Sequence, residues 1–265
     1  MTLALPEALA YVVQTAQAAG EVILAHDAPV PRIPTRMKGV RDPVTDADLA
    51  SERLIVERLR ARFPGVPIAA EEETHERGGD GPVFYVDPLD GTVNFSQALP
   101  FFAVSIALYE GRTPRLGVVH APRLRETFAA AAGAGATLNG EPLAVSRKQR
   151  LIDAVLATGF AYRRNELPDD NVQHFVDTIL KVRDLRRGGS AALDLAYVAA
   201  ARLDGHWEPH LNAWDVAAGA ALVLEAGGVV TDMAGGQDWL QGGSIIASGP
   251  ALHPAIAAVV GRAPP

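Results

Sequence analysis

The chain has 265 residues, 48% of them hydrophobic and 21% charged, which is the composition of a globular protein with a sizeable core. It has no Cys, which excludes disulfides and thiol catalysis, and its net charge of −7 argues against non-specific nucleic-acid binding. No apolar run approaches the length of a membrane span, and the N-terminus lacks the basic start of a signal peptide. We therefore expect a cytoplasmic protein with no membrane or nucleic-acid partner.

The N-terminal third is predicted to be mainly helical. Apolar residues at helical spacing predict a helix over 6–26, and a Pro-rich basic segment over 28–41 predicts a loop or irregular extended chain. Thr45 and Asp48 resemble a capping box, so we expect a second helix from there to about Phe63. Acids in a first helical turn compensate the helix dipole and do not by themselves indicate chemistry.

Two predicted strands end in acidic residues. The first, over 66–70, is followed by Glu71, Glu72 and Glu73, and the second, over 83–86, delivers Asp87. Pro88 cannot continue a central ladder, so we expect a turn there that brings Asp90 beside Asp87. Acids at the ends of two strands can form one metal-binding cup, although acids and Gly also occur in ordinary surface turns.

The composition of this stretch favours a particular metal and a particular ligand. Carboxylates without Cys suit Mg²⁺ or Mn²⁺ better than zinc. The backbone N–H groups of Gly91 and Thr92, which follow Asp90, could face an anion. Because an acidic cluster repels a phosphate, a metal would have to reverse the local sign of charge.

The remaining chain alternates runs of strands with single helices. Strands are expected over 102–108, 115–120, 126–131, 154–160, 229–231 and 244–247, with a hairpin at Asn139-Gly140 and a short extended stretch at Trp207-Glu208. Helices are expected over 169–183, from Ser190 to about 203, over 213–226, and up to about 260. This order favours layered sheets with helices between them, in one domain over 1–265 with possible halves 1–145 and 146–265.

Several common catalytic motifs are absent from the sequence. It has no P-loop, no Gly-x-Gly-x-x-Gly after a strand and no Gly-x-Ser-x-Gly elbow. His206 and His210 lie in an extended stretch and are interpreted as ordinary core or surface histidines. Any chemistry must therefore come from carboxylates, Thr and a metal.

Three groups of residues resemble the inositol monophosphatases, a Mg²⁺-dependent family within the lithium-sensitive sugar-phosphatase superfamily. The first is residues 87–95, the second is 214–219 with 225–228, and the third is the acids of 42–48 with Glu71 and Glu72. The resemblance covers nearly the whole chain in order. It implies an α+β fold, the layered αβαβα sandwich of the inositol monophosphatase and fructose-1,6-bisphosphatase type.

The resemblance also implies roles for individual residues. The ligands of two Mg²⁺ ions would be Glu71, Asp87, the carbonyl of Leu89, Asp90 and Asp215, and Glu72 would bind a third metal through water. Asp48 and Thr92 would activate the attacking water, while the backbone N–H groups of Gly91 and Thr92 would hold the phosphate. The residues facing the inositol hydroxyls would be Asp90, Ala191, Glu208 and Asp215.

The chain departs from the family pattern at two positions. Ala70 replaces the usual Gly before the paired Glu residues, a small change that should be tolerated. Lys38 matches the loop Lys of the family only approximately, so it is left out of the expected site.

The expected function is Mg²⁺-dependent hydrolysis of inositol monophosphate by direct attack of water, and the resemblance suggests a homodimer. Histidinol phosphate, fructose 1,6-bisphosphate and adenosine 3′,5′-bisphosphate remain alternative substrates. A haloacid-dehalogenase-type phosphatase spaces its two acids two apart, whereas Asp87 and Asp90 are three apart. A non-catalytic regulatory protein would have no physical need for so many crowded carboxylates.

Overall fold

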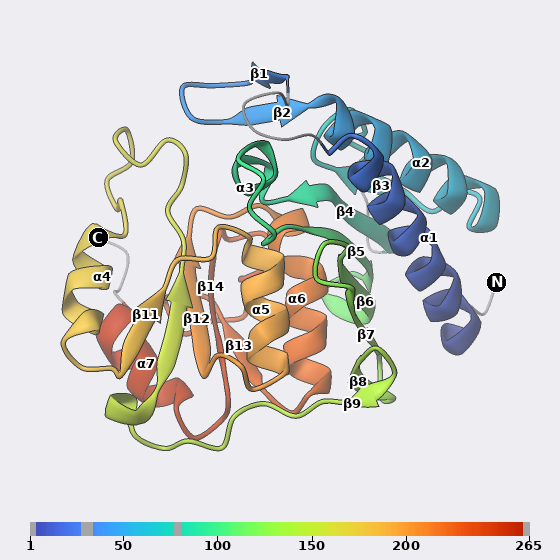
Figure 1. The fold of residues 1–265 in the computed structure, drawn as a ribbon. Coiled ribbons are helices and arrows are strands. Elements are labelled where there is room, and N and C mark those ends of the chain that lie inside the picture. The colour runs from blue at the N-terminus through green and yellow to red at the C-terminus, as the bar shows by residue number, and fades with distance from the viewer. Residues whose placement is uncertain (1–3, 28–33, 77–80, 262–265) are drawn as a thin grey trace.

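The fold is an α+β sandwich of five layers, as expected. The computed structural model describes residues 4–27, 34–76 and 81–261. Helices α1 and α2 cover one face of a seven-stranded sheet, and α5 and α6 separate that sheet from a five-stranded one, whose far side carries α4 and α7 (Figure 1). Three hydrophobic core clusters fill the spaces between these layers.

The seven-stranded sheet has the order β3-β4-β5-β6-β7-β8-β9, and only β3 and β4 are parallel. Its strands are β3 (Ile68–Ala70), β4 (Pro82–Asp90), β5 (Ala103–Glu110), β6 (Thr113–Ala121), β7 (Glu126–Ala131), β8 (Gly135–Leu138) and β9 (Glu141–Pro142). The predicted hairpin at Asn139-Gly140 is confirmed: it joins β8 to β9, and both residues have positive φ, 50° and 90°. Two such residues are typical of a tight hairpin turn that matches the strand twist.

The five-stranded sheet has the order β11-β10-β12-β14-β13. Its strands are β10 (Val155–Thr158), β11 (Asp184–Arg186), β12 (Gly205–Pro209), β13 (Val229–Thr231) and β14 (Ser244–Ser248). The sequence analysis missed β11, which has three residues and pairs only with β10 at the sheet edge. It also made the preceding helix too long, because α4 covers only Val172–Ile179.

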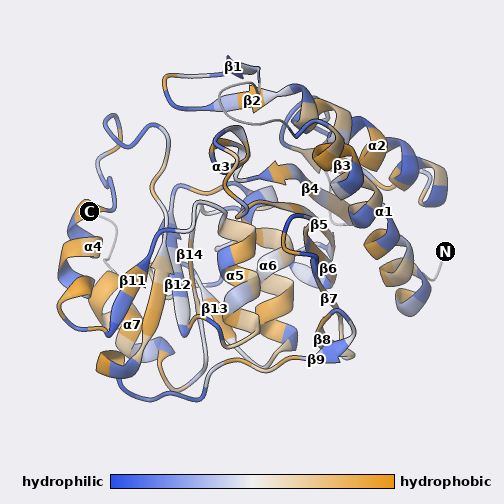
Figure 2. Cartoon of the chain, viewed as in Figure 1, coloured by the Kyte–Doolittle hydropathy of each residue, from blue (hydrophilic) through white to orange (hydrophobic). Residues whose placement is uncertain are grey.

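Of the other helices, α1 (Leu5–Ala25), α2 (Asp46–Arg62), α6 (Ala213–Glu225) and α7 (His253–Val260) lie close to their expected bounds, and α5 (Ala191–Ala199) ends before the expected residue 203. The short helix α3 (Thr92–Ser96) and a 3₁₀ turn over Leu151–Asp153 were not predicted. The two central helices, α5 and α6, are mostly hydrophobic along their length, whereas α1 and α2 carry hydrophilic residues as well (Figure 2). The difference arises because α5 and α6 are buried between two sheets, whereas α1 and α2 pack against a sheet on one side only.

One helix among the described residues, α1, is long and apolar enough to cross a membrane by length and composition, which the sequence analysis did not anticipate. Its buried residues include Val12, Ala16 and Ile23, which belong to the core cluster between α1, α2 and the seven-stranded sheet. The apolar face of α1 is therefore used in packing within the fold.

The segment expected to be a loop is partly a hairpin. Strand β1 (Thr35–Met37) pairs antiparallel with β2 (Pro43–Thr45), and residues 38–42 form the turn between them. Residues 28–33 of the expected loop lie outside the described residues. The hairpin leads directly into α2 and places the 38–42 turn near the ends of β3 and β4.

The expected turn at Pro88 was wrong. Strand β4 continues to Asp90, and its register against β5 shifts between Asp87 and Asp90, which is a bulge rather than a turn. Pro88 is tolerated because β3 pairs with β4 only as far as Val86, so no ladder partner requires an N–H at residue 88. The chain turns instead at Gly91, whose φ of 96° suits Gly, and enters α3.

Candidate active site

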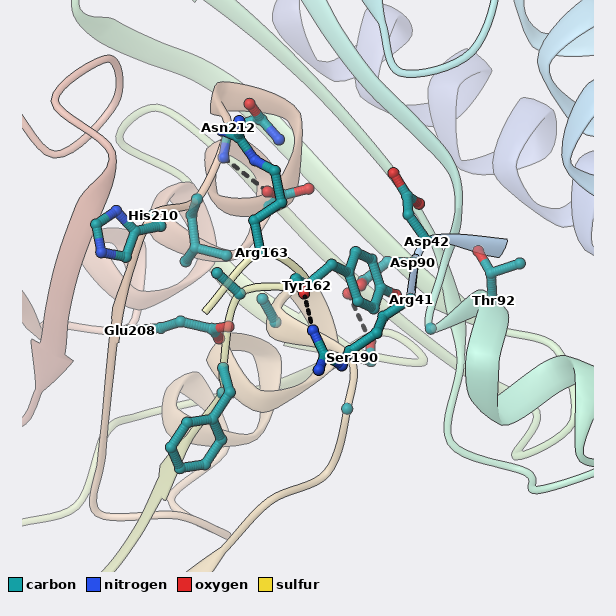
Figure 3. Close-up of a pocket in the computed structure, with 18 of the residues that line it drawn as sticks. Arg41, Asp42, Asp90, Thr92, Tyr162, Arg163, Ser190, Glu208, His210 and Asn212 are labelled. Atoms are coloured by element: carbon teal, nitrogen blue, oxygen red, sulfur yellow. Dashed lines mark hydrogen bonds between the residues drawn. The ribbon is translucent and has the colours of Figure 1, made fainter. Parts of the chain in front are cut away.

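A polar cavity of about 490 Å³ lies where the end of β4 meets the first turns of α5 and α6 and the end of β12. Most of the predicted site residues line it: Glu71, Asp87, Leu89, Asp90, Gly91, Thr92, Ala191, Glu208 and Asp215. The side chains converge on the cavity from both halves of the chain (Figure 3). Asp48 and Glu72 are not among the lining residues, but each contacts one: Asp48 accepts from Thr92, and Glu72 pairs with Lys38.

The bulge of β4 fixes Asp87 at the bottom of the cavity. Its Oδ1 accepts a hydrogen bond of 3.0 Å from the backbone N–H of Leu89, and only 2% of the residue is exposed. Burial raises the pKa of Asp87 well above its ordinary value, and the negative charges of Glu71, Asp90 and Asp215 raise it further. The mutual repulsion of these acids would be relieved by a cation near them.

Asp90 joins the two halves of the chain. Its Oδ2 accepts hydrogen bonds from Ser190 Oγ at 2.6 Å and from the backbone N–H of Ala192 at 2.7 Å, both at the start of α5 (Figure 3). Ser190 is also the predicted N-cap of α5 and accepts from Leu193 N–H. Burial raises the pKa of Asp90 to about 7 despite these two bonds. Both donors bind Oδ2, so neither of these two bonds occupies Oδ1.

Asp215 is held at the first turn of α6. The backbone N–H of Asn212 donates to its Oδ2 at 2.7 Å in a capping box. Burial raises the pKa of Asp215 well above its ordinary value, and the charge of Glu71 adds to the effect. An acid in a first helical turn can serve the helix dipole alone. Asp215 also lines the cavity.

The acids after β3 are fixed by a residue that the sequence analysis missed. Glu52 of α2 is buried, and its carboxylate accepts from the backbone N–H groups of Glu72, Glu73 and Thr74 at 2.8–2.9 Å. It follows Asp48 by four residues on the same helix, so both lie on one face. That spacing was the only signal available, because acids on helices are usually solvated.

Lys38 forms ion pairs with Glu71 and Glu72, the first two of the acids that follow β3. Its Nζ lies 2.8 Å from Glu71 Oε1 and 2.9 Å from Glu72 Oε1. Burial opposes the charge of Lys38, but pairing with Glu71 and Glu72 raises its pKa above the ordinary value. Burial raises the pKa of Glu72 to about 7, although Lys38 works against this shift. Lys38 therefore belongs to the site, although it was left out of the expected set.

Asp48 and Thr92 form the predicted pair. Thr92 Oγ1 donates to Asp48 Oδ1 at 2.9 Å and lies 3.1 Å from the carbonyl oxygen of Leu89. The other oxygen of Asp48 accepts from the backbone N–H and the hydroxyl of Thr45, which completes the predicted capping box of α2. Burial raises the pKa of Asp48. A buried acid that accepts the Thr92 proton can orient that hydroxyl toward the cavity.

The side of the cavity away from Thr92 is formed by β12 and α5. Glu208 points into the cavity from β12, and Ala191 begins α5 (Figure 3). The carboxylate of Glu208 lies against Gly159, where a Cβ would overlap it. Gly159, Asp194 and Arg187 also line the cavity and were missed: Gly159 lies inside a predicted strand, Arg187 between predicted elements and Asp194 on a buried helix face.

Two loops meet at the mouth of the cavity. Arg41 of the β1–β2 turn donates to the carbonyl of Tyr162 at 3.3 Å and to Oδ1 of Asn165 at 2.6 Å (Figure 3). Burial raises the pKa of Tyr162 above its ordinary value, and the acids of the cavity contribute. This contact could not be predicted from the sequence, since its partners are more than 120 residues apart.

The chemistry of the donor set suits a hard divalent cation. All candidate ligands are oxygen atoms, and the crowded acids raise each other's pKa. Among the described residues no group of three or more acids or histidines already forms a metal-binding cluster. Glu71 is paired with Lys38, while Asp90 and Asp215 each accept a hydrogen bond from a backbone N–H group.

A sequence model described as "Inositol monophosphatase family" matches residues 5–264. The chain belongs to the inositol monophosphatase family. It is 42% identical over 248 residues to Nus factor SuhB of Escherichia coli K12, covering 93% of this chain and 92% of that protein. The crystal structure of suhB from Bartonella henselae has a TM-score of 0.90 at 38% identity, covering 97% of this chain and 100% of that one.

Inositol monophosphatase from Anabaena sp. PCC 7120 is similarly close, with a TM-score of 0.88, 38% identity and 98% coverage of both chains. Members of the inositol monophosphatase family thus match the fold across its full extent, and the five layers described above are the family's fold. Membership of this family supports the assignment of the chain as a Mg²⁺-dependent phosphatase. The relatives named SuhB leave the activity of this chain to be tested.

Proposed function

We propose that the protein is a Mg²⁺-dependent phosphomonoesterase that hydrolyses inositol monophosphate to inositol and phosphate. The observation that carries the proposal is the convergence of Glu71, Asp87, Asp90 and Asp215 on one cavity, with the Thr92–Asp48 pair at its edge. Phosphoryl transfer needs positioning and charge neutralisation more than covalent chemistry; the four acids would hold the cations that neutralise the phosphate, and the Thr92–Asp48 pair would position the water.

The metal ligands in this proposal come from two walls of the cavity. Glu71, Asp87 and the carbonyl of Leu89 would hold one Mg²⁺, and Asp87, Asp90 and Asp215 a second, with Glu72 serving a third through water; Mn²⁺ has the same ligand preference. When bound, the metal would lower the pKa of a water and neutralise phosphate charge. Glu71 is now paired with Lys38 and would have to exchange this partner for the metal.

The protein groups would carry out the remaining steps. Thr92 would orient the attacking water, because its hydroxyl is directed by Asp48 and held beside the Leu89 carbonyl. The N-terminal N–H groups of α3, at Gly91 and Thr92, have no partner within that helix and would bind phosphate oxygens. Water would attack the phosphorus directly, without a phospho-enzyme.

The hydroxyl side of the substrate would face Asp90, Ala191, Glu208 and Asp215. Glu208 favours a polyol, because a carboxylate accepts hydrogen bonds from two neighbouring hydroxyls. The cavity of about 490 Å³ is large enough for other small phosphorylated substrates. Histidinol phosphate, fructose 1,6-bisphosphate and adenosine 3′,5′-bisphosphate therefore remain the alternative substrates to test.

The test is phosphate release by the purified protein from these four substrates, with and without Mg²⁺. The Asp90→Asn variant should stay folded and lose activity by roughly 100-fold or more, because it loses charge at a metal ligand. Asp46→Asn is the matched control, since Asp46 lies on the surface in an exposed ion pair with Arg36. Full activity in Asp90→Asn, or no release from any substrate with Mg²⁺ or Mn²⁺, would contradict the proposal.

A second candidate function comes from the name of the relatives, which are called Nus factors. The absence of a nucleic-acid partner stays a prediction for this reason. The test is whether the chain, and separately its Asp90→Asn variant, replaces SuhB in an E. coli strain that lacks it. Replacement by both would assign a role that does not need the phosphatase site, and failure of both would leave the enzyme as the function.

The remaining expectations concern the whole molecule. We propose a single domain over residues 1–265, which is supported by a central core cluster built from residues on both sides of residue 145. A homodimer and a cytoplasmic location also stay proposals. Light scattering at several protein concentrations tests the first of these, and cell fractionation tests the second.

A further inference from the structure

A buried histidine lies directly behind the hydroxyl side of the cavity. His206 is the second residue of β12 and is fully buried, with 0% of its side chain exposed. Residues two apart on a strand face the same way, so His206 and Glu208 both point to the α5 side of the sheet. The residue between them, Trp207, points to the other side, where its indole N–H binds Asn171.

The imidazole of His206 lies between two carboxylates. Its Nε2 is 3.5 Å from Glu208 Oε2, and its Nδ1 is 3.9 Å from Asp194 Oδ2 on α5. Neither ring nitrogen makes a hydrogen bond to any of the residues that the structure describes. Buried polar nitrogens are nearly always hydrogen-bonded, and each ring nitrogen of His206 has a carboxylate oxygen within 4 Å as its candidate partner.

Both acids line the cavity and both are buried: Glu208 is 8% exposed and reaches into the cavity (Figure 3), and Asp194 is 3% exposed. Burial, together with the charges of Glu208 and Asp90, raises the pKa of Asp194 well above its ordinary value, while Arg187 works against the shift. The small residues Gly159 and Gly188 leave room for the two carboxylates, because a Cβ at either position would crowd one of them.

We propose that His206 is a positioning residue, which donates from Nε2 to Glu208 and so directs that carboxylate toward the hydroxyls of the substrate. The inference rests on the proposed phosphatase function and adds a residue to its specificity site. His206 does not touch the reacting phosphate, so it should affect substrate binding rather than turnover. Asp194 would hold the other side of the ring at Nδ1.

Two substitutions separate the two nitrogens. The side-chain amide of His206→Gln places a donor near the position of Nε2, and that of His206→Asn places one near Nδ1. For inositol 1-phosphate, His206→Asn should raise KM about five- to tenfold with kcat within twofold, as expected for lost ground-state binding. His206→Gln should keep KM within about twofold of the wild type, since it retains the donor toward Glu208.

The control substrate is p-nitrophenyl phosphate, which has no hydroxyls for Glu208. Both variants should leave its KM and kcat unchanged. Equal effects of His206→Asn on both substrates would show a general structural role and overturn the proposal. A KM of His206→Asn for inositol 1-phosphate equal to that of the wild type would also overturn it. In a Glu208→Gln background, His206→Asn should have no further effect on KM. Failure of the wild type to hydrolyse inositol 1-phosphate would instead refute the proposed function.

If His206→Asn does not fold, a measurement on the wild-type protein tests the positioning role of His206. The imidazole ¹⁵N resonances of His206 should shift when myo-inositol is added, whereas those of exposed His26 should not. Binding of myo-inositol without a change at His206 would overturn the proposal.

Discussion

The buried acid Glu52 offers a test of how the turn after β3, which carries the proposed metal ligand Glu71, is held in place. Its carboxylate accepts from three successive backbone N–H groups, those of Glu72, Glu73 and Thr74. In Glu52→Gln only one oxygen remains. It can keep the two bonds now made by Oε1, but the new NH₂ group faces the N–H of Glu72. A buried hydrogen bond to a charged group contributes about 1.5–3 kcal/mol, so we expect a loss of about 2–3 kcal/mol in the free energy of unfolding.

The assay is urea unfolding followed by circular dichroism, with a thermal melt as a second measurement. A loss of this size corresponds to a fall of roughly 5–10 °C in Tm for a chain of this length. Glu57→Gln is the matched control, because Glu57 lies on the exposed side of the same helix and should change the free energy by less than about 0.5 kcal/mol. Mg²⁺ affinity should fall in Glu52→Gln, since Glu71 and Glu72 belong to the turn. Equal stability of the two variants would refute the reasoning.

Two further predictions concern the hydroxyl side of the cavity and the acids. Gly159→Ala should raise KM for inositol 1-phosphate and spare p-nitrophenyl phosphate, because its Cβ would displace the Glu208 carboxylate; equal kinetics on both substrates would contradict this. In metal-free protein, burial raises the pKa values of Glu72 and Asp90 to about 7, so both bind protons more tightly when folded. Stability without metal should therefore fall as the pH rises from about 5 to about 8, and Mg²⁺ should restore it. A urea midpoint in EDTA that does not fall across this range would count against the assignment.

The local parts of the site could be predicted from the sequence. Thr45 and Asp48 are three residues apart, and a capping box depends only on that spacing and on the helix that follows. Asp215 at the start of α6 and the Asn139-Gly140 hairpin are local in the same way. The layered fold followed from the order of strands and helices, because each element has to bury its apolar face against another.

Two predictions were wrong or missing because neighbouring strands override a local rule. Pro88 was expected to end β4, but β3 stops pairing at Val86, so the strand can continue with a bulge. The edge strand β11 was missed because three residues carry too little pattern. In both cases the deciding fact is which strand lies alongside, and that is a property of the sheet.

The contacts that complete the cavity depend on tertiary structure. Ser190 binds Asp90 across 100 residues of sequence, and Lys38 reaches Glu71 across 33. Glu52 and His206 carry no motif; each matters because another element brings a backbone N–H or a carboxylate against it. The sequence by itself determined which residues have the chemistry for a metal-dependent phosphatase. Packing of the layers decided which of them meet, since hydrogen bonds and ion pairs act only over a few ångströms.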